Sequence, residues 1–293
     1  MSNDDRNTIF LEQARILAHD QLPEQQYVLR VNAPECAAHA KPGQFAHLQC
    51  DHRLPMRRPL SIMRVSDQEG WVEFLYKVVG DGTHALAQRT ASEQISLLGP
   101  IGKPFTLNPK RPRKLLIGGG VGIPPMIFLA QVLSDSPEDA ERTLVLMGSE
   151  APFPFNAASS RLSVEPMPGD ITAAHPVLEE WNIASRLASL SGFPNCFNGH
   201  VTALARVWLA SFSNDAYDEI EVFACGPEPM LQAVAGLTHD YGLPCQLSLE
   251  EYMACGVGGC AGCTIRVHTS SGPAMKRVCV DGPVFEASTL YPN

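Results

Sequence analysis

Basic residues are in the minority in this chain. Its 293 residues include 22 Lys and Arg against 31 Asp and Glu, which gives a formal net charge of −9. Proteins that bind nucleic acids need clustered Lys and Arg to neutralise the phosphates. The charge balance therefore argues against a nucleic-acid partner.

Long apolar runs are equally scarce. Leu115–Leu133 holds 19 residues without a charged side chain, which approaches the length of a transmembrane helix. However, the run contains four glycines, followed by Pro124 and Pro125. Such punctuation is typical of a buried strand, a glycine loop and a helix, so no membrane span is predicted.

A signal-peptide pattern is also missing. Met1–Phe10 has neither a basic n-region nor an apolar h-region, which predicts a cytoplasmic location with reduced thiols. Nine cysteines are present, and an odd number of them lie outside any recognisable spacing, which again favours reduced thiols. These five are Cys36, Cys50, Cys196, Cys225 and Cys245.

The other four cysteines form the most informative pattern in the chain. They read C-x4-C-x2-C-x15-C, and the first three have the spacing of plant-type [2Fe–2S] ligands. The loop that carries them is rich in glycine, which tolerates positive φ and lets backbone N–H groups turn toward the cluster sulfides. We therefore predict a [2Fe–2S] cluster held by four thiolates: Cys255, Cys260, Cys263 and Cys279.

Zinc binding and disulfide formation are the alternatives for these cysteines. Zinc sites usually pair two short C-x2–4-C arms, whereas here three cysteines fall within nine residues and the fourth stands apart. Disulfides require an oxidising compartment. If the chain were a structural protein held together by zinc at these cysteines, metal analysis would detect zinc in it.

The length of the chain favours two or three domains. Residues 8–105 contain short runs with alternating or β-branched residues, separated by turn signals such as Pro42-Gly43. This pattern predicts a small antiparallel barrel over residues 1–110. Its predicted strands are Thr8–Ala18, Gln26–Val31, Gln44–Gln49, Leu60–Val65, Trp71–Val79 and Gln94–Leu98, with a short helix over Thr83–Arg89.

From residue 113 the pattern changes to strands that alternate with helices. This predicts a parallel sheet with crossover connections over residues 111–246, followed by a small cluster-binding arm over residues 247–293. Ala151–Gly199 has no clean period, and a helix is predicted there over Leu178–Leu190. The other predicted elements are the strands Lys114–Ile117, Thr143–Met147 and Glu219–Ala224 and the helices Pro124–Ser134 and Glu228–His239.

The predicted barrel contains a candidate diphosphate site. Arg58-Pro59-Leu60-Ser61 lies on a predicted strand, and Gly80-Asp81-Gly82-Thr83 begins a predicted helix. A glycine turn at a helix N-terminus presents free N–H groups to a phosphate, and an arginine can form a bidentate pair with it. The alternative is that Arg58 is simply a solvated strand end.

A second candidate site lies in the predicted α/β domain. The loop Gly118–Pro125 follows a predicted strand, and its glycines would let the backbone approach a pyrophosphate, although the pattern departs from G-x-G-x-x-G. Cys225-Gly226-Pro227 follows another predicted parallel strand, at the edge where open α/β sheets bind ligands. The alternatives are tight packing for the loop and a small buried core residue for Cys225.

Taken together, these motifs resemble the ferredoxin–NADP reductase superfamily. Within it, Glu250–Gly256, the cysteine run and Arg277–Phe285 closely resemble the electron transfer subunits of dihydroorotate dehydrogenase. The resemblance implies FAD on the barrel, NAD(H) on the α/β domain and a [2Fe–2S] cluster on the arm. By the same resemblance, Cys225 is the catalytic residue at the nicotinamide. The resemblance assigns FAD binding to Arg58, Pro59, Leu60, Ser61, Tyr76, Gly82 and Thr83. It assigns binding of the nicotinamide nucleotide to Gly119, Gly120, Gly122, Pro124, Gly226 and Pro227.

The resemblance also implies a function and a partner. Electrons would pass between NADH, FAD, the cluster and the FMN of a catalytic subunit that oxidises dihydroorotate to orotate in pyrimidine biosynthesis, since only a flavin exchanges both hydride and single electrons. A heterotetramer with two catalytic subunits is expected, with Val284 and Phe285 as apolar contacts to the partner. No Arg pair for a 2′-phosphate is found, which favours NADH over NADPH.

Two other functions are compatible with much of this pattern. A reductase component for a ferredoxin, oxygenase or hydrogenase partner would differ only in the final acceptor. The short gap before Cys279 argues against the oxygenase version, whose reductases usually carry a complete ferredoxin domain. A non-enzymatic cluster-binding sensor would differ by lacking NADH-dependent flavin reduction.

Overall fold

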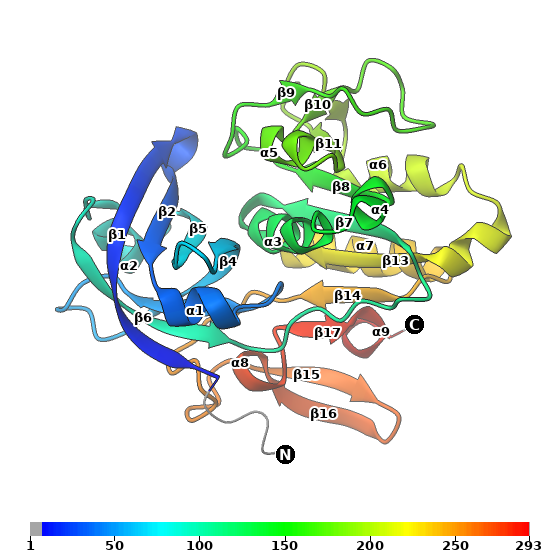
Figure 1. Ribbon diagram of the computed structural model, residues 1–293. Coiled ribbons are helices and arrows are strands. Elements are labelled where there is room, and N and C mark those ends of the chain that lie inside the picture. Colours follow the sequence, from blue (N-terminus) through cyan, green and yellow to red (C-terminus); the bar gives the residue numbers. More distant parts are fainter. Residues whose placement is uncertain (1–7, 293) are drawn as a thin grey trace.

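The computed structural model describes residues 8–292 in three connected parts. A closed six-stranded antiparallel barrel lies beside a seven-stranded, mostly parallel sheet, and a two-stranded hairpin lies below both (Figure 1). This architecture confirms the predicted fold class of a β-barrel, an α/β domain and a small C-terminal arm. The prediction of no signal peptide rests on Met1–Phe10, of which residues 1–7 lie outside the described residues.

The barrel strands follow the order β1-β2-β5-β4-β3-β6. Strand alternation decides which side chains face inward, so that on β5 Phe74 and Tyr76 belong to the barrel core and Leu75 packs toward the α/β domain. The predicted strands are all present, and β1 runs on as far as Leu22. The barrel elements are β1 (Phe10–Leu22), β2 (Gln26–Asn32), α1 (Pro34–His39), β3 (Phe45–Gln49), β4 (Arg58–Ser66), β5 (Trp71–Lys77), α2 (Asp81–Ala87) and β6 (Gln94–Ile101).

The sheet has the order β12-β11-β8-β7-β13-β14-β17. Its first six strands are parallel and β17 is antiparallel to β14. Helices α3 and α5 cover one face, and α6 and α7 cover the other. The elements are β7 (Arg113–Gly119), α3 (Ile123–Leu133), α4 (Pro137–Glu141), β8 (Thr143–Gly148), α5 (Pro176–Glu180), β11 (Ala184–Ser189), β12 (Phe197–Asn198), α6 (Val201–Leu209), β13 (Ile220–Cys225), α7 (Glu228–Asp240), β14 (Cys245–Ser248) and β17 (Val284–Glu286).

The strand order reverses between β7 and β13. From β7 the chain steps outward through β8 to β11 and then returns to place β13 on the other side of β7. The loops at the carboxyl ends of these two strands therefore diverge, and open α/β sheets bind ligands in the crevice that results. Among the helices within residues 8–292, none is both long and apolar enough to cross a membrane.

The helix predicted over Leu178–Leu190 is wrong. The chain forms only the short helix α5 before Asn182 takes a left-handed conformation with a φ of 57°, and Ala184–Ser189 is the strand β11 between β8 and β12. A strand buried on both faces lacks the alternation of a half-exposed one, so its apolar run cannot be distinguished from a buried helix by periodicity.

Two buried charges hold the irregular segment that precedes β11. Glu179 accepts hydrogen bonds from the Ser160 hydroxyl at 2.6 Å and the Arg161 N–H at 2.9 Å. Arg186 donates to the carbonyl oxygens of Leu162 and Ser185, both at 2.7 Å. These side chains supply the hydrogen bonds that regular structure would otherwise provide, which lets a long loop keep a fixed path.

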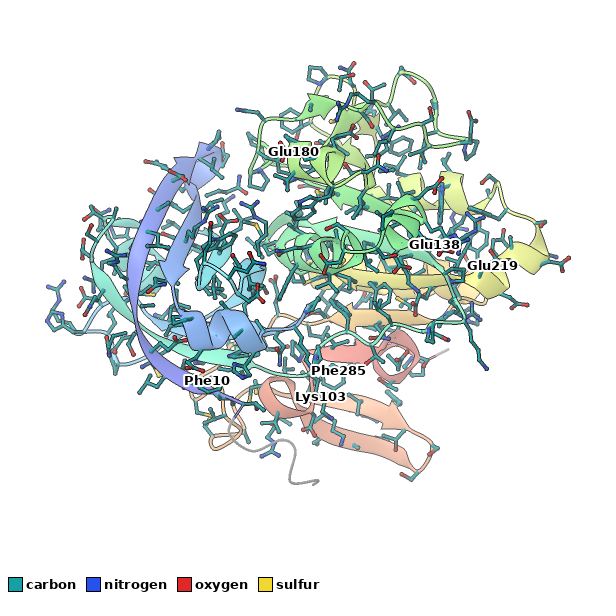
Figure 2. The ribbon with its side chains drawn as sticks, viewed as in Figure 1. Phe10, Lys103, Glu138, Glu180, Glu219 and Phe285 are labelled. Atoms are coloured by element: carbon teal, nitrogen blue, oxygen red, sulfur yellow. The ribbon has the colours of Figure 1, made fainter. Side chains whose placement is uncertain are left out.

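The C-terminal arm packs against both other parts. Its elements are β15 (Thr264–Thr269), β16 (Gly272–Arg277), α8 (Val278–Asp281), β17 and α9 (Ala287–Leu290). Gly43 and Gly102 both have positive φ, and a Cβ on Gly102 would lie 2.4 Å from Pro283 Cδ. The Lys103 N–H donates to the Gly282 carbonyl at 2.5 Å at this junction, where Lys103 and Phe285 are labelled in Figure 2.

One expectation about the arm is corrected by this packing. Val284 is only 9% exposed, because it lies on β17 within the sheet and against Gly43. It is therefore a core residue and does not form a surface contact for a partner. Phe285 is half-buried in an apolar cluster between barrel and arm, together with Phe45 and Ile101.

A buried ion pair fixes the connection between barrel and sheet. Lys114 on β7 and Glu221 on β13 are both buried, and Lys114 Nζ lies 2.5 Å from Glu221 Oε1. Glu221 also accepts the Asn108 N–H at 3.0 Å, and Lys114 donates to the Asn108 and Arg111 carbonyls. Each charge thus needs the other, since an unpaired charge is very unfavourable in the interior.

Lys114→Met is expected to lower the free energy of unfolding by about 3 to 5 kcal/mol, because it leaves Glu221 buried without a counter-charge. Urea unfolding measures this loss. The exposed pair of Arg206 and Asp240, whose atoms lie 2.8 Å apart, is the matched control. Arg206→Met should lower the free energy by about 1 kcal/mol or less, and equal losses in both variants would contradict the account.

Candidate functional site

The four predicted cluster cysteines come together in two pairs on the arm. In the first pair, the Cys260 N–H points at the sulfur of Cys255 at 3.4 Å. The Gly262 N–H points at the sulfur of Cys260, also at 3.4 Å. In the second pair, the sulfurs of Cys263 and Cys279 lie 3.3 Å apart. Among residues 8–292 no group of three or more His, Cys, Asp or Glu side chains is arranged to hold a single metal ion. Three cysteines on the glycine-rich loop and Cys279 on α8 thus form two thiol pairs, which is the donor set that a two-iron cluster requires.

The backbone of the loop favours thiolate at Cys255. Burial raises the pKa of this thiol, but N–H donors of Cys260, Val257 and Gly259 outweigh it and lower the pKa to about 6. Cys279 behaves in the opposite way, because burial and the neighbouring Cys263 thiol raise its pKa to about 12. The loop therefore presents one preformed anionic ligand, with its N–H groups already directed at sulfur.

Arg277 holds the cluster loop in place. Its Nη1 donates to the Gly258 carbonyl at 2.9 Å, and its backbone N–H donates to Asp281 Oδ2 at 2.8 Å. Gly258 has a φ of 80°, and a Cβ there would lie 2.5 Å from Val280 Cγ2. The segment after the hairpin and the glycine loop are thus locked together around the cysteines.

His47 lies under the same loop on the barrel side. The residue is fully buried on β3, and a Cβ on Gly256 would lie 2.8 Å from its ring. Burial and the neighbouring Arg57 lower the pKa of His47 to about 4, so its ring is neutral at neutral pH. Arg57 itself donates to the backbone carbonyls of His47 and Ser96, which ties β3 to β6.

The structure brings Arg58 and Gly82 into direct contact. A Cβ on Gly82 would lie 2.2 Å from Arg58 Nε, so only glycine leaves room for the guanidinium. Arg58 is half-buried and donates to the Met56 carbonyl at 2.8 Å, and within residues 8–292 no carboxylate pairs with it. An arginine without a counter-charge beside a glycine backbone fits a diphosphate.

The other predicted barrel residues have different surroundings. The Thr83 hydroxyl accepts the Val79 N–H at 3.0 Å and donates to the Gly80 carbonyl, so it caps α2. Ser61 is half-buried on β4, where its register partner is Phe45 and its neighbour Leu60 belongs to the barrel core. Tyr76 points into the barrel, where its hydroxyl lies 2.8 Å from His19 Nε2 and burial raises its pKa. Pro59 is half-buried next to Arg58.

The predicted nucleotide residues meet at the carboxyl ends of β7 and β13. Gly118 and Cys225 are register partners in these two neighbouring strands. A Cβ on Gly122 would lie 2.3 Å from the carbonyl carbon and oxygen of Cys225, and one on Gly119 would lie 2.4 Å from Met230 Sδ. The start of α3 therefore approaches the β13 loop so closely that glycine is required.

Gly120 and Pro124 complete this edge, with Gly226 and Pro227 facing them. Gly120 has a φ of 54° and open space where a Cβ would be, whereas Pro124 is buried in the first turn of α3. A Cβ on Gly226 would lie 2.5 Å from Met230 Cε, and Pro227 is the N-cap residue of α7. This close backbone approach at the switch point fits a pyrophosphate.

Cys225 itself is fully buried. Burial raises the pKa of its thiol well above the usual range, and the nearby Glu250 carboxylate raises it further. The thiol is therefore neutral, and its environment is that of a core cysteine at the end of a buried strand. The role of Cys225 beside a nicotinamide stays a prediction.

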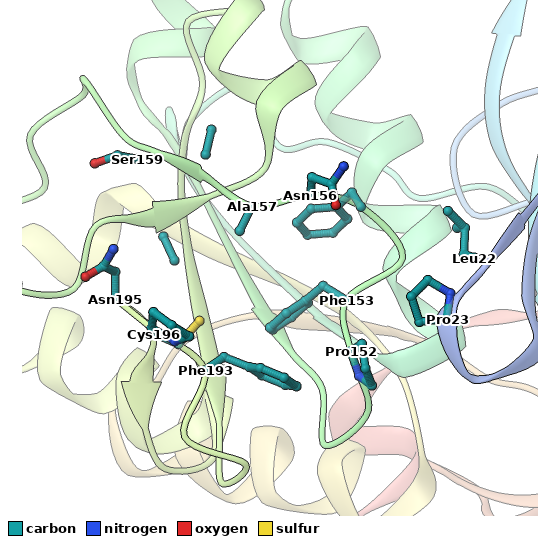
Figure 3. A pocket seen from close by; sticks show the side chains of 14 residues that line it. Leu22, Pro23, Pro152, Phe153, Asn156, Ala157, Ser159, Phe193, Asn195 and Cys196 are labelled. Atoms are coloured by element: carbon teal, nitrogen blue, oxygen red, sulfur yellow. The ribbon is translucent and has the colours of Figure 1, made fainter.

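A separate cavity of about 530 Å³ lies between the barrel and the α/β domain (Figure 3). Leu22 and Pro23 line it from the barrel side, and residues 152–153, 155–159 and 193–196 line it from the loops after β8 and β11. Three phenylalanines dominate its wall, and none of the predicted site residues contributes to it.

Sequence reasoning missed three residues around the cluster. His47, Arg57 and Arg277 each contact the cluster loop or the strand beneath it. His47 and Arg57 lie outside every motif, and Arg277 begins the segment Arg277–Phe285 that carries the resemblance but has no role assigned by it. The register of β3 against β4 and β6 brings His47 to the cluster loop and Arg57 to the strand beneath it, and no local sequence pattern predicts that register.

The fold is similar to that of several solved reductases. The structure of an NADH-dependent reduced ferredoxin–NADP oxidoreductase, studied for flavin-based electron bifurcation, matches with a TM-score of 0.74 and 24% identity over 96% of this chain and 90% of that chain. The ferredoxin reductase of carbazole 1,9a-dioxygenase matches with a TM-score of 0.58 and 21% identity over 80% of this chain and 67% of that chain. These likenesses define the class as the ferredoxin reductase fold.

Sequence comparison then identifies the family. Residues 250–291 match the iron–sulfur cluster binding domain of dihydroorotate dehydrogenase B. The chain is 31% identical to the dihydroorotate dehydrogenase B (NAD(+)) electron transfer subunit of Geobacillus thermodenitrificans over 95% of this chain and 98% of the relative, and 32% identical to that of Listeria innocua over 94% and 97%. The chain therefore belongs to the family of dihydroorotate dehydrogenase B electron transfer subunits, which confirms the predicted resemblance.

Cys255 is expected to be the first cysteine modified in protein prepared without iron. Its pKa of about 6 makes it largely thiolate at pH 7, so its alkylation rate should rise through pH 6 and level off above pH 7. Cys279, with a pKa of about 12, should stay unmodified up to pH 9. Iodoacetamide labelling with peptide mass spectrometry measures both. A Cys255 rate that rises only near pH 8.5, as for an ordinary thiol, would contradict this assignment.

Gly122→Ala is expected to lower the free energy of unfolding by about 1 to 3 kcal/mol, because the new Cβ would force α3 away from the Cys225 carbonyl. Gly236→Ala is the matched control, since nothing lies within 4 Å of a Cβ there and alanine favours the helix α7. Urea unfolding compares the two, and equal stability of both variants would show that α3 does not need the glycine.

Proposed function

We propose that this chain is the electron transfer subunit of a dihydroorotate dehydrogenase and passes electrons between a nicotinamide nucleotide and a catalytic subunit in pyrimidine biosynthesis. The family and its electron-transfer function agree with the prediction from the sequence. The observation that supports this function most strongly is the paired arrangement of four thiols on an arm that packs against the barrel. The thiols therefore lie next to the barrel, to which FAD is assigned.

The cofactors of this function are FAD, a [2Fe–2S] cluster and NAD(H). When bound, FAD supplies the exchange between hydride and single electrons, and the cluster supplies a one-electron carrier. Residues 1–110 are assigned to FAD, residues 111–246 to the nucleotide and residues 247–293 to the cluster. The strand β17, which joins the sheet, connects the last two units.

Each set of residues has a distinct task in this assignment. Arg58 and the Gly82 backbone hold the FAD diphosphate, while Pro59 and Ser61 line the rest of the flavin site. Leu60 and Tyr76 support it from the barrel core, and Thr83 supports it by capping α2. Gly119, Gly120, Gly122 and Pro124 hold the nucleotide pyrophosphate, opposite Cys225, Gly226 and Pro227. The protein provides no general acid or base in this scheme, and its work is to orient cofactors and exclude water. The ligands of the cluster are Cys255, Cys260, Cys263 and Cys279.

The partner is a catalytic subunit of dihydroorotate dehydrogenase that carries FMN, in a heterotetramer with two copies of each chain. We assign its docking surface to the exposed rim of the cluster loop. Cys260 is exposed there, and Tyr252 and Val257, which flank Cys255 in the sequence, are 93% and 51% exposed. Exposed apolar side chains next to a redox centre are suited to a partner that must come close. The complex is assigned to the cytoplasm and to NADH as its nucleotide.

The function is tested by combining the reconstituted protein with a dihydroorotate dehydrogenase catalytic subunit from the same cell, under anaerobic conditions. The pair should reduce NAD with dihydroorotate, and neither subunit alone should do so. Bleaching of flavin and cluster bands by NADH without coupling to the catalytic subunit would reject the pyrimidine function. It would favour the reductase alternative with another acceptor.

Tyr252→Asp and Val257→Asp are each expected to weaken binding of the catalytic subunit at least tenfold, because they place charge in an apolar contact. Sedimentation or surface plasmon resonance measures the affinity. Val132→Asp is the matched control, since Val132 is 41% exposed on α3, away from the cluster loop. Unchanged affinity in both loop variants would place the docking surface elsewhere.

A further inference from the structure

His47 is a fully buried histidine whose ring has no hydrogen-bond partner. Its exposure is 0%, and within residues 8–292 neither Nδ1 nor Nε2 is hydrogen-bonded. Leaving a buried polar group unpaired is unfavourable by about 1 to 3 kcal/mol, and native interiors pair nearly all such groups. Because both ring nitrogens of His47 are unpaired, its N–H is available to a partner that does not belong to the polypeptide.

The ring of His47 faces the cluster loop. Alternation along β3 turns Ala46 and Leu48 into the barrel core, so Phe45 and His47 point outward toward the arm. A Cβ on Gly256 would lie 2.9 Å from His47 Nδ1 and 3.1 Å from Nε2. Gly256 follows the ligand Cys255 directly, and its φ of 70° lets the loop come this close. The imidazole thus lies at the edge of the cluster site.

The backbone of His47 is paired with the strand assigned to FAD. His47 is the register partner of Pro59, which follows Arg58 on β4. The backbone carbonyl of His47 accepts a hydrogen bond from Arg57 at 3.3 Å. One residue therefore connects the strand assigned to FAD with the loop assigned to the cluster.

A neutral imidazole carries one N–H donor and one acceptor nitrogen. Burial disfavours the charged form, so His47 offers a single N–H. Hydrogen bonds to the sulfurs of an iron–sulfur cluster stabilise its reduced, more negative form and raise its reduction potential. An N–H at this position is therefore suited to favour movement of an electron from flavin to cluster.

We propose that His47 is a positioning residue whose imidazole N–H donates to a sulfur of the cluster or of its ligand Cys255 and raises the cluster potential relative to that of FAD. The proposal rests on the cofactors assigned under the proposed function. It adds a determinant on the barrel, outside the cysteine motif, that tunes the direction of electron transfer.

The alternative is that His47 only fills space. Its ring centroid lies 5.8 Å from that of Phe45, at a tilt of 53°, so it also packs in the apolar contact between barrel and arm. A space-filling residue would affect stability alone. A hydrogen-bond donor would affect the reduction potential and the magnetic signature of the cluster.

The test uses the reconstituted holoprotein and the variants His47→Leu and His47→Gln. Redox titrations monitor the cluster by electron paramagnetic resonance and the flavin by absorbance. His47→Leu should shift the flavin–cluster electron equilibrium about tenfold toward the flavin, which corresponds to about 59 mV for one electron. His47→Gln keeps an N–H donor and should restore most of the wild-type balance.

His175→Leu is the matched control. His175 is also buried with an unpaired Nδ1, but it lies against Phe155 in the α/β domain. This variant should change the melting temperature without changing the cluster potential. A His47→Leu variant that loses stability but keeps the wild-type cluster potential would overturn the proposal, as would a shift confined to the flavin.

A second measurement uses only the wild-type protein, so it does not depend on whether a variant folds. Wild-type protein labelled with ¹⁵N-histidine should show a weak ¹⁵N hyperfine coupling to the reduced cluster in pulsed electron paramagnetic resonance. If a fully loaded cluster shows no such coupling, the role of His47 is overturned and the proposed function stands. A wild-type protein that takes up neither FAD nor a cluster would overturn the proposed function, and this inference with it.

Discussion

The close contact between the C-terminal arm and the barrel is the constraint on which the rest of the structure depends. Gly43 and Gly102 adopt positive φ at this contact, and a side chain on either would collide with Val284 or Pro283. Electron transfer requires carriers that are held near one another. The apolar cluster between Phe45, Ile101 and the buried cysteines Cys263 and Cys279 holds the arm against the barrel, while Cys260 stays exposed at the rim of the loop.

The same principle of backbone approach recurs at the nucleotide edge. Gly122 allows the start of α3 to touch the Cys225 carbonyl, and Gly82 allows the backbone of α2 to touch the Arg58 guanidinium. At all three sites, glycine removes the side chain that would otherwise fill the space between two elements. The chain thus brings its own elements into close contact around the sites assigned to the cofactors. Its charged side chains serve mainly to fix the elements around these sites, as Arg277 does for the cluster loop.

The sequence predicted the features that depend on local spacing. The cysteine spacing, the glycine loop before α3 and the alternation of the barrel strands are all set within a few residues, and the structure places them as expected. Features that depend on tertiary register could not be predicted from the sequence. Ala184–Ser189 became a strand because both of its faces are buried, Val284 entered the sheet, and His47 reached the cluster loop only through the pairing of β3 with β4. The roles of the individual flavin and nucleotide residues depend on bound cofactors and stay predictions.

The most direct test of the account is the order in which the centres are reduced. Rapid mixing of the oxidised, reconstituted protein with NADH would follow the flavin by absorbance and the cluster by freeze-quench electron paramagnetic resonance. The account predicts that the flavin is reduced first and that the cluster signal then grows at the rate at which reduced flavin is lost. Cluster reduction that precedes the flavin, or a cluster that stays oxidised beside fully reduced flavin, would contradict the claim that arm and barrel form one path for electrons.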